Sequence, residues 1–367
     1  MLSPIKNYML TLLIISSLFF QTSWAEDVQH QPIVNELITL LSQNPNIKAE
    51  VKKSLLIANR FEEPRLKSFY TFLDDMVTLI PTDRNLNPKM LEFYYNIDHS
   101  NKGFLQKNPQ FQKWTHKFAN DWGTFLDTPA SSVKLNTLYS NPIFHINDYD
   151  RGTSGWLTFN QFFYRHIKPG KRAIDSLCDD KVIVSPADSV IQGSWNITKN
   201  STIVAKGLEW SIADLLEGSP YQDRFKGGVY THMFLNVNDY HRFHLPVKGE
   251  ILEARNIHGK VVSDVKLKED GTLEDIIGPT FQFHQERALI IIDSPVGLVA
   301  VLPIGMAQVS SVNLTVEKGL NLVKGDEFGY FAFGGSDVVI LFEANKVKIT
   351  AQSGQHYNQG KKIAIAK

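Results

Sequence analysis

Residues 331–343 have the sequence Phe331-Ala-Phe-Gly-Gly-Ser-Asp-Val-Val-Ile-Leu-Phe-Glu343, in which a glycine pair and a serine interrupt large apolar residues. The alternating phenylalanines and the apolar run behind the serine predict a buried strand. Two glycines inside such a pattern indicate a bulge or a close backbone approach. One chemistry uses this arrangement, because the Ser336 hydroxyl can attack the unhindered carbonyl of Gly335. An ordinary hairpin turn is the alternative that this stretch alone leaves open.

The composition is that of a globular protein. The chain has 367 residues, of which 43% are hydrophobic and 21% are charged, and this length suggests about one to three domains. Lys plus Arg and Asp plus Glu each number 38, so no net charge favours nucleic acid as a partner. Cys178 is the only cysteine, which excludes an internal disulfide and a cysteine metal cluster.

The N-terminus has the pattern of an export signal. Lys6 precedes an apolar run over residues 8–20, and Ser23-Trp24-Ala25 fits a small-x-small cleavage site. We therefore expect a signal peptide over residues 1–25 and a periplasmic or secreted protein. An uncleaved segment that anchors the protein to the membrane is the alternative.

The hydrophobic period changes along the chain. Between residues 31 and 126 apolar residues recur every three or four positions, as in the stripe of Trp114, Phe118 and Trp122, which predicts helices. From residue 182 onward short strands dominate, separated by turns such as Glu269-Asp-Gly271. The sequence thus predicts an α+β protein with a helical N-terminal domain over residues 26–150 and a strand-dominated domain over residues 151–367.

The second half of the chain contains two polar clusters that the formation of strands does not explain. His241 and His244 lie three residues apart in Asp239-Tyr-His-Arg-Phe-His244, and Asp188 follows a short apolar strand. The histidines could be surface residues, bind a metal, or act as general base and second acid–base group. Asp188 could cap a turn. With Ser336 these residues also make up a set in which aspartate orients histidine and histidine takes the serine proton.

In these motifs the chain resembles the phosphatidylserine decarboxylase family of pyruvoyl enzymes. The segments that carry the resemblance follow the family's order: Phe159-Asn-Gln-Phe-Phe-Tyr-Arg165, Lys168-Pro-Gly-Lys-Arg172, Ser185-Pro-Ala-Asp188, residues 206–216, residues 238–246, Phe283-His-Gln-Glu-Arg287 and Gly334-Gly-Ser336. The helical part is more loosely similar to the domain that precedes the catalytic half in the tryptophan-decarboxylase-like branch.

The resemblance implies a zymogen that cleaves itself between Gly335 and Ser336. Ser336 would become a pyruvoyl group at the start of a small subunit, and this group would accept the substrate amine and then the electrons released with carbon dioxide. His244 matches the base for processing, Asp188 matches the residue that orients it, and His241 matches the histidine of the decarboxylation step. No metal is implied.

Asp337 departs from the family, in which a small hydroxyl residue usually follows the serine. A carboxylate there could hinder processing by repelling the developing oxyanion, or it could pair with a substrate ammonium. The lesser departure is Ser189, where the family usually has glycine.

The resemblance implies a decarboxylase of phosphatidylserine, which produces phosphatidylethanolamine for phospholipid biosynthesis. A pyruvoyl decarboxylase of a free aromatic amino acid such as tryptophan is one alternative, and an unprocessed exported binding protein is another. The expected partners are the amino-group substrate and the protein's own small subunit. Membrane contact and a homo-oligomer are left open.

Overall fold

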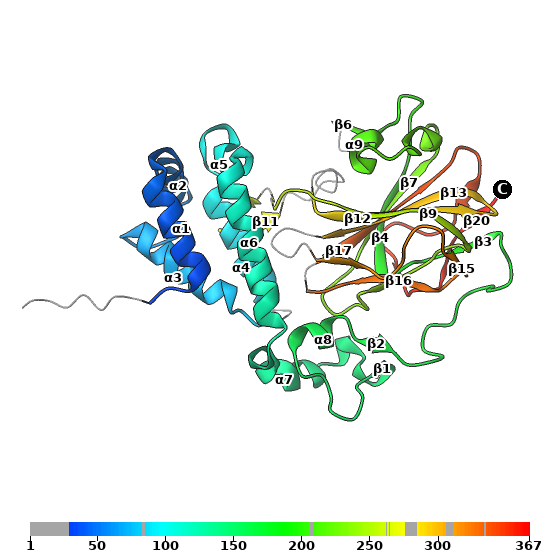
Figure 1. The fold of residues 1–367 in the computed structure, drawn as a ribbon, viewed down its shortest axis with the longest axis horizontal. Helices are drawn as coiled ribbons and strands as arrows, with labels where there is room; N and C mark the ends of the chain where they lie inside the picture. The colour runs from blue at the N-terminus through cyan, green and yellow to red at the C-terminus, as the bar shows by residue number, and fades with distance from the viewer. Residues whose placement is uncertain are drawn as a thin grey trace, which may run out of the picture.

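The computed structural model describes residues 29–82, 85–205, 208–261, 263, 265–275, 285–305, 311–333 and 335–367. The predicted signal peptide lies outside the described residues. Within the described ranges, no helix is both long enough and apolar enough to cross a membrane. Helices come first along the chain and strands second, and the two parts lie side by side (Figure 1). The predicted α+β class is confirmed.

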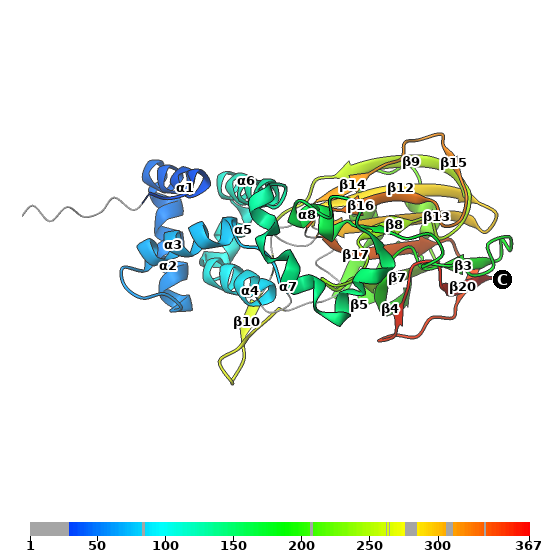
Figure 2. The same ribbon diagram turned by 90° about the horizontal axis from the view of Figure 1, so that it is seen from below.

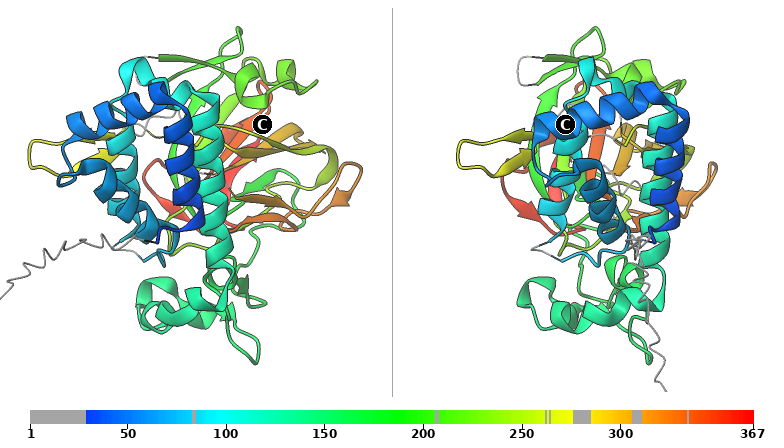
Figure 3. Two further views of the ribbon diagram at one scale, coloured as in Figure 1. Left: turned by 60° about the vertical axis from the view of Figure 1, so that its left-hand side comes forward. Right: turned by 90° about the vertical axis from the view of Figure 1, so that its left-hand side faces the viewer.

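Amphipathic helices form the N-terminal part, as the spacing of apolar residues predicts. They are α1 (Pro32–Gln43), α2 (Pro45–Ala58), α3 (Arg65–Val77), α4 (Leu86–Ile97), α5 (Phe104–Lys107) and α6 (Pro109–Leu126). In α6 the side chain of Asn108 caps the first turn by accepting from two backbone N–H groups. The predicted stripe of Trp114, Phe118 and Trp122 is buried. These helices gather at one end of the strand-rich part (Figure 3).

A segment of short elements connects the two parts. It contains α7 (Leu135–Tyr139), β1 (Tyr149–Asp150), α8 (Phe159–Phe163) and β2 (His166–Ile167). The side chain of Thr158 caps α8 by accepting from the Gln161 N–H. Because α8 packs against α6, it lies where the helices meet the sheet.

Strands make up most of the rest. They are β3 (Val182–Val184), β4 (Ser189–Asn196), β5 (Thr202–Ala205), β6 (Leu208–Ser211), β7 (Val229–Phe234), β8 (Arg242–His244), β9 (Gly249–Ile257), β10 (Val265–Leu267), β11 (Leu273–Asp275), β12 (Arg287–Ser294), β13 (Gly297–Gly305), β14 (Val312–Leu314), β15 (Asn321–Leu322), β16 (Glu327–Phe331), β17 (Gly335–Phe342), β18 (Val347–Ile349), β19 (His356–Tyr357) and β20 (Lys362–Ala366). One further helix, α9 (Ile212–Leu216), lies between β6 and β7.

The large sheet has the strand order β15-β9-β12-β13-β17-β7-β4-β19, so β17 is a central strand. Its strand pairs are antiparallel. Two three-stranded sheets, β14-β16-β8 and β18-β20-β3, complete the strand-rich part. The hairpin of β10 and β11 extends to α4 (Figure 2), and the Val265 N–H donates to Asp98 Oδ2 at 3.2 Å.

Both faces of β17 are buried, because alternate residues enter two different cores. Val338 and Ile340 pack in the core that continues into the helical part and includes the β14-β16-β8 layer. Val339 and Leu341 pack in a second core, which α9 covers. A near-continuous apolar run is what a strand buried on both faces requires.

Candidate active site

Ser336 lies at a β-bulge near the start of β17. The two strands β17 and β13 pair regularly as far as Ile304 opposite Asp337, and the next pair is Gly305 opposite Gly335. Ser336 therefore has no counterpart on β13. Bulges re-aim a residue and are frequent next to active sites. The bulge predicted from the glycine pair is confirmed, whereas the first glycine of the pair and the serine side chain lie outside what the structure describes.

The chain just ahead of the bulge is held between α6 and α8. The Phe333 ring packs edge-on against Trp122 of α6 and Phe163 of α8, at 5.1 and 5.4 Å between ring centroids. Its backbone N–H donates to Asn160 Oδ1 at 2.9 Å. Asn160 also donates from Nδ2 to Asp127 Oδ1 at 2.9 Å. The position two residues before Gly335 is therefore fixed by side-chain packing and by a hydrogen bond.

His241 packs against the same aromatic group. Its ring stacks on Phe163 with 3.8 Å between centroids, and its carbonyl accepts from the Phe331 N–H at 2.9 Å. The side chain is buried, and within the described part of the chain its Nδ1 has no hydrogen-bond partner. Burial, followed by the charge of Arg165, lowers the pKa of His241 to about 3. The imidazole is therefore neutral near pH 7.

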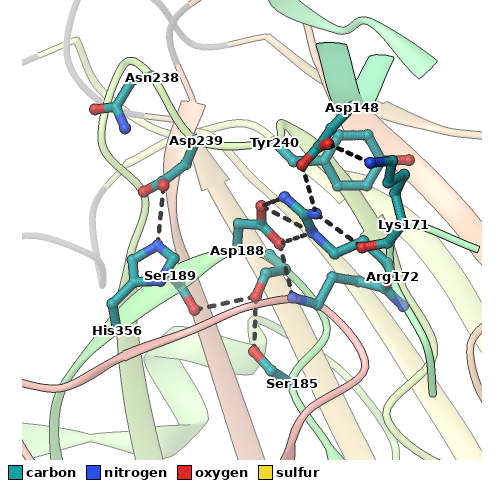
Figure 4. Close-up of polar contacts among 12 residues, drawn as sticks. Asp148, Lys171, Arg172, Ser185, Asp188, Ser189, Asn238, Asp239, Tyr240 and His356 are labelled. Atoms are coloured by element: carbon teal, nitrogen blue, oxygen red, sulfur yellow. Dashed lines mark hydrogen bonds and ion pairs between the residues drawn. The ribbon is translucent and has the colours of Figure 1, made fainter. Parts of the chain in front are cut away.

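Arg165 positions the loop that carries His241. Its buried guanidinium donates to the carbonyls of Asn238 at 2.8 Å and Asp239 at 3.2 Å. The Asp239 carboxylate in turn accepts from His356 Nε2 at 2.9 Å (Figure 4). This hydrogen bond raises the pKa of His356. The loop is thus tied on one side to the end of α8 and on the other to β19.

His244 is in the tautomer that a general base needs. Its Nδ1 lies 2.8 Å from the Gly325 carbonyl, which can only accept, so Nδ1 carries the proton. Its Nε2 lies 3.1 Å from the Tyr240 hydroxyl and therefore holds the lone pair. Burial lowers the pKa of His244, which keeps this nitrogen unprotonated near neutral pH.

The partner of Asp188 is Arg172 rather than His244. Arg172 donates from Nε to Asp188 Oδ1 at 2.9 Å and from Nη2 to Oδ2 at 2.5 Å (Figure 4). Asp188 also accepts the Gln359 N–H at 2.7 Å. The His244 N–H donates to the Pro186 carbonyl at 2.8 Å, so the two segments adjoin. Asp188 and His244 are nevertheless not hydrogen-bonded to each other, because the planar guanidinium takes both carboxylate oxygens.

Asp337 lies on the second core's face of β17. It is fully buried, and its Oδ2 lies 3.2 Å from Nε2 of the buried His232 on β7. By strand alternation it shares the face of Val339, whereas Val338 and the Phe333 contacts belong to the other core. The carboxylate thus has a protein partner on the side of the sheet away from Phe333.

Several residues of this site received no role from the sequence. Arg172, Asn160 and Tyr240 lie inside the motifs that carry the family resemblance. Their position in these motifs was the one feature of the sequence that could have indicated a role. His232 belongs to none of those motifs. Its position beside apolar and aromatic residues in β7 was the available sign.

Comparisons with known proteins agree with the motifs. The family model for phosphatidylserine decarboxylase matches residues 159–365, which is more than half of the chain. The chain belongs to the phosphatidylserine decarboxylase family. The matched region includes α8, β17 and all the predicted site residues, whereas α1–α6 precede it.

Three relatives illustrate the similarity. The phosphatidylserine decarboxylase proenzyme of Fusobacterium nucleatum is 32% identical over 254 residues, which are 67% of this chain and 82% of that protein. Proenzyme 3 of Schizosaccharomyces pombe is 37% identical over 224 residues, which are 61% of this chain and 22% of that protein. The proenzyme of Clostridium botulinum is 27% identical over 287 residues, which are 74% of this chain and 95% of that protein.

As a member of the phosphatidylserine decarboxylase family, the protein is a carboxy-lyase that depends on a pyruvoyl group derived from serine. The predictions of family, enzyme class and cofactor are confirmed, and the comparisons give no support to a free-amino-acid decarboxylase or a binding protein. The residues present fit such a group. Gly335 offers no side chain, Ser336 lies at a bulge, and the buried His241 close by has a ring nitrogen without a partner in the described part.

Proposed function

We propose that the protein cleaves itself between Gly335 and Ser336 and then converts phosphatidylserine to phosphatidylethanolamine and carbon dioxide. The observation that carries this proposal is the β-bulge that leaves Ser336 without a partner on β13. A regular ladder would pair this residue on both sides, whereas a bulge leaves the extra residue unpaired and bends the strand. The relatives named phosphatidylserine decarboxylase proenzymes support both halves of the proposal.

Processing needs a base, a nucleophile and one water molecule. The Ser336 hydroxyl attacks the Gly335 carbonyl, so that an ester replaces the peptide bond and the serine amine is freed. Loss of the Ser336 α-proton then breaks the Cβ–Oγ bond and releases Gly335 as a carboxylate. Water next replaces the nitrogen, which leaves as ammonia, and a ketone remains. His244 Nε2 is the proposed proton acceptor, because its Nδ1 proton is held by the Gly325 carbonyl.

In turnover the pyruvoyl group supplies an electrophilic ketone and a sink for the electrons released with carbon dioxide. The chain's own residues then have to manage one proton. The neutral His241 carries one N–H proton, which it can deliver to the substrate carbon from which carbon dioxide has left. At the same time its other ring nitrogen accepts a replacement proton, so that the ring stays neutral. Its burial keeps bulk water from that carbon, and Arg165 holds the loop in place.

The N-terminal residues and the substrate class suggest where this reaction takes place. We propose that the protein is exported and that Glu26 begins the mature chain, because Ser23-Trp24-Ala25 fits signal cleavage. A lipid substrate also requires contact with a membrane surface, which is part of the same proposal.

Intact-mass analysis of the purified protein tests the processing step. We expect a large chain from Glu26 to Gly335 and a small chain of 367 − 336 + 1 = 32 residues, whose N-terminus is blocked because pyruvoyl has no amine. Ser336→Ala should give one uncut chain, and His244→Ala should give nearly the same result. Ser353→Ala, which changes an exposed serine in the same small chain, is the matched control and should be cut normally.

The cleaved enzyme is then incubated with phosphatidylserine in mixed micelles, and phosphatidylethanolamine is measured by mass spectrometry. His241→Ala should be cleaved but inactive. Turnover of free tryptophan without turnover of the lipid would replace the proposed substrate. A wild-type protein that remains one chain with an intact Ser336 would overturn the proposed function.

A further inference from the structure

A cavity of about 300 Å³ lies between α6, α8 and the chain just ahead of the processing bulge. Its walls include Asn120, Gly123, Thr124 and Asp127 from α6 and the residue that follows it, together with Asn160 of α8 and Phe333. The wall formed by α6 precedes the region matched by the family model, which begins at residue 159. The cavity therefore combines residues shared with the family and residues from this chain's own helical part.

We infer that this cavity binds the ammonium-bearing head of the substrate and that α6 acts as a specificity wall. This inference rests on the proposed function for the identity of the substrate. The cavity borders Phe333, which stands two positions before Gly335. A ligand in it is therefore next to the segment whose cleavage creates the reactive group.

The charge of the cavity walls selects the kind of ligand. Asp127 provides a carboxylate, and the other polar walls are amide and hydroxyl groups, whereas none of the described lining residues is basic. Such walls favour a hydrogen-bond-donating cation and disfavour a phosphate. A serine head group would thus enter with its ammonium end, and its phosphodiester would remain toward solvent.

Gly123 supplies the second argument. It lies inside α6, where glycine weakens a helix relative to alanine. Packing against the described residues does not require a glycine here, because a Cβ atom added at this position would meet nothing within 4 Å. A side chain larger than hydrogen would instead project into the space beside the cavity walls. We infer that glycine keeps this space open for the ligand.

Asn160 links the cavity to the processing segment. It is almost fully buried, donates to Asp127, and accepts from the Phe333 N–H. A ligand that pairs with Asp127 would therefore contact the same hydrogen-bond chain that holds the residues before the bulge. This connection assigns Asp127 a positioning role as well as a binding role.

Equilibrium titration of the uncut Ser336→Ala protein tests the inference without requiring turnover. The probe is glycerophosphoserine, the soluble head group, and the comparison ligand is glycerophosphoglycerol, which lacks the ammonium. We expect calorimetry to show tighter binding of glycerophosphoserine. Asp127→Asn and Gly123→Leu, each in the same background, should weaken it by about tenfold or more, since an ammonium–carboxylate hydrogen bond is lost or the space is filled.

The matched controls separate occupation of the cavity from damage to the fold. Asp121→Asn removes a carboxylate from the same helix without altering a cavity wall, and it should bind as the parent does. Gly123→Ala should raise the Tm while weakening the probe, a combination that unfolding does not produce. Equal affinity for both ligands, or unchanged affinity in Gly123→Leu and Asp127→Asn, would overturn the inference. Head-group binding without turnover of phosphatidylserine by the wild type would instead count against the proposed function alone.

Discussion

The imidazole of His241 is buried, and burial disfavours its protonated form. It stacks on Phe163, and the positive charge of Arg165 also disfavours its protonation. Both effects favour the neutral ring, and together they lower the pKa of His241 to about 3. The ring of His241 therefore stays neutral throughout the pH range around 7.

The lowered pKa of His241 also makes stability depend on pH. Below the ordinary histidine pKa the unfolded chain binds a proton at this residue, whereas the folded protein does so only near pH 3. Stability should therefore fall as the pH decreases from about 6.5 towards 3, by at most about 1.4 kcal/mol per pH unit for this residue, and it should be level above that window. We expect denaturant titrations of the uncut protein to show a shallower pH dependence for His241→Gln.

His145→Gln is the control for that measurement, because His145 is exposed and its side chain forms no ion pair with the described residues. It should leave the pH dependence of stability as it is in the parent. Identical slopes for His241→Gln and the parent between pH 3 and 6.5 would show that the buried ring does not resist protonation.

At the scale of secondary structure, β17 places neighbouring residues in different surroundings. Asp337 faces the second core with His232, while the Phe333 contacts lie in the other core. The sequence left open whether Asp337 hinders processing or pairs with the substrate. Because its side chain faces the second core, we expect its effect on processing to be small. Its carboxylate already has a buried partner in the protein.

We expect Asp337→Thr to change stability more than processing. Removal of the carboxylate breaks its contact with the buried His232, which should cost about 1–3 kcal/mol and lower the Tm. The extent of self-cleavage on a denaturing gel should remain that of the wild type. Asp293→Asn, at an exposed strand position, is the control and should alter neither property. A marked change in cleavage rate at an unchanged Tm would show that Asp337 acts on the processing step directly.

The spacing of apolar residues predicted the helices and strands that bury one face or both faces. Ile33, Leu37 and Leu41 recur at helical spacing, and all three are buried in α1. The predicted strand at residues 338–342 lies within β17. Leu56 is 60% exposed, whereas its neighbour Leu55 is buried, because adjacent residues of a helix point in different directions.

Partners of buried charges could not be predicted in the same way. Arg172 reaches Asp188 across a turn of the chain, and His232 meets Asp337 only because β7 pairs with β17. Such contacts depend on strand order, which apolar spacing does not specify. The cavity beside Gly123 was unpredictable for the same reason, since it exists only where α6 meets α8.

At the scale of the whole molecule, the helical part and the sheet share one continuous core. Trp122 of α6 packs on Phe333, and the hairpin of β10 and β11 contacts α4. The helices therefore support the catalytic half directly. Together the two parts bring the cavity and the aromatic partners of Phe333 next to the residues that precede the bulge.

The central position of β17 has a consequence for how the protein refolds. After the proposed cleavage the 32-residue chain from Ser336 to Lys367 would still supply a strand between β13 and β7 and further strands beside β3 and β4. Before cleavage that strand is covalently tethered, so its effective concentration is high. Afterwards folding becomes a bimolecular reaction.

We therefore expect Ser336→Ala protein diluted from denaturant to regain its native circular dichroism with a yield that does not depend on concentration. The cleaved enzyme should recover only at high concentration and poorly when dilute. Equal recovery of both at every concentration would show that the small chain is not needed to complete the sheet. Self-cleavage thus turns a chain that can refold into one that stays native because it unfolds slowly.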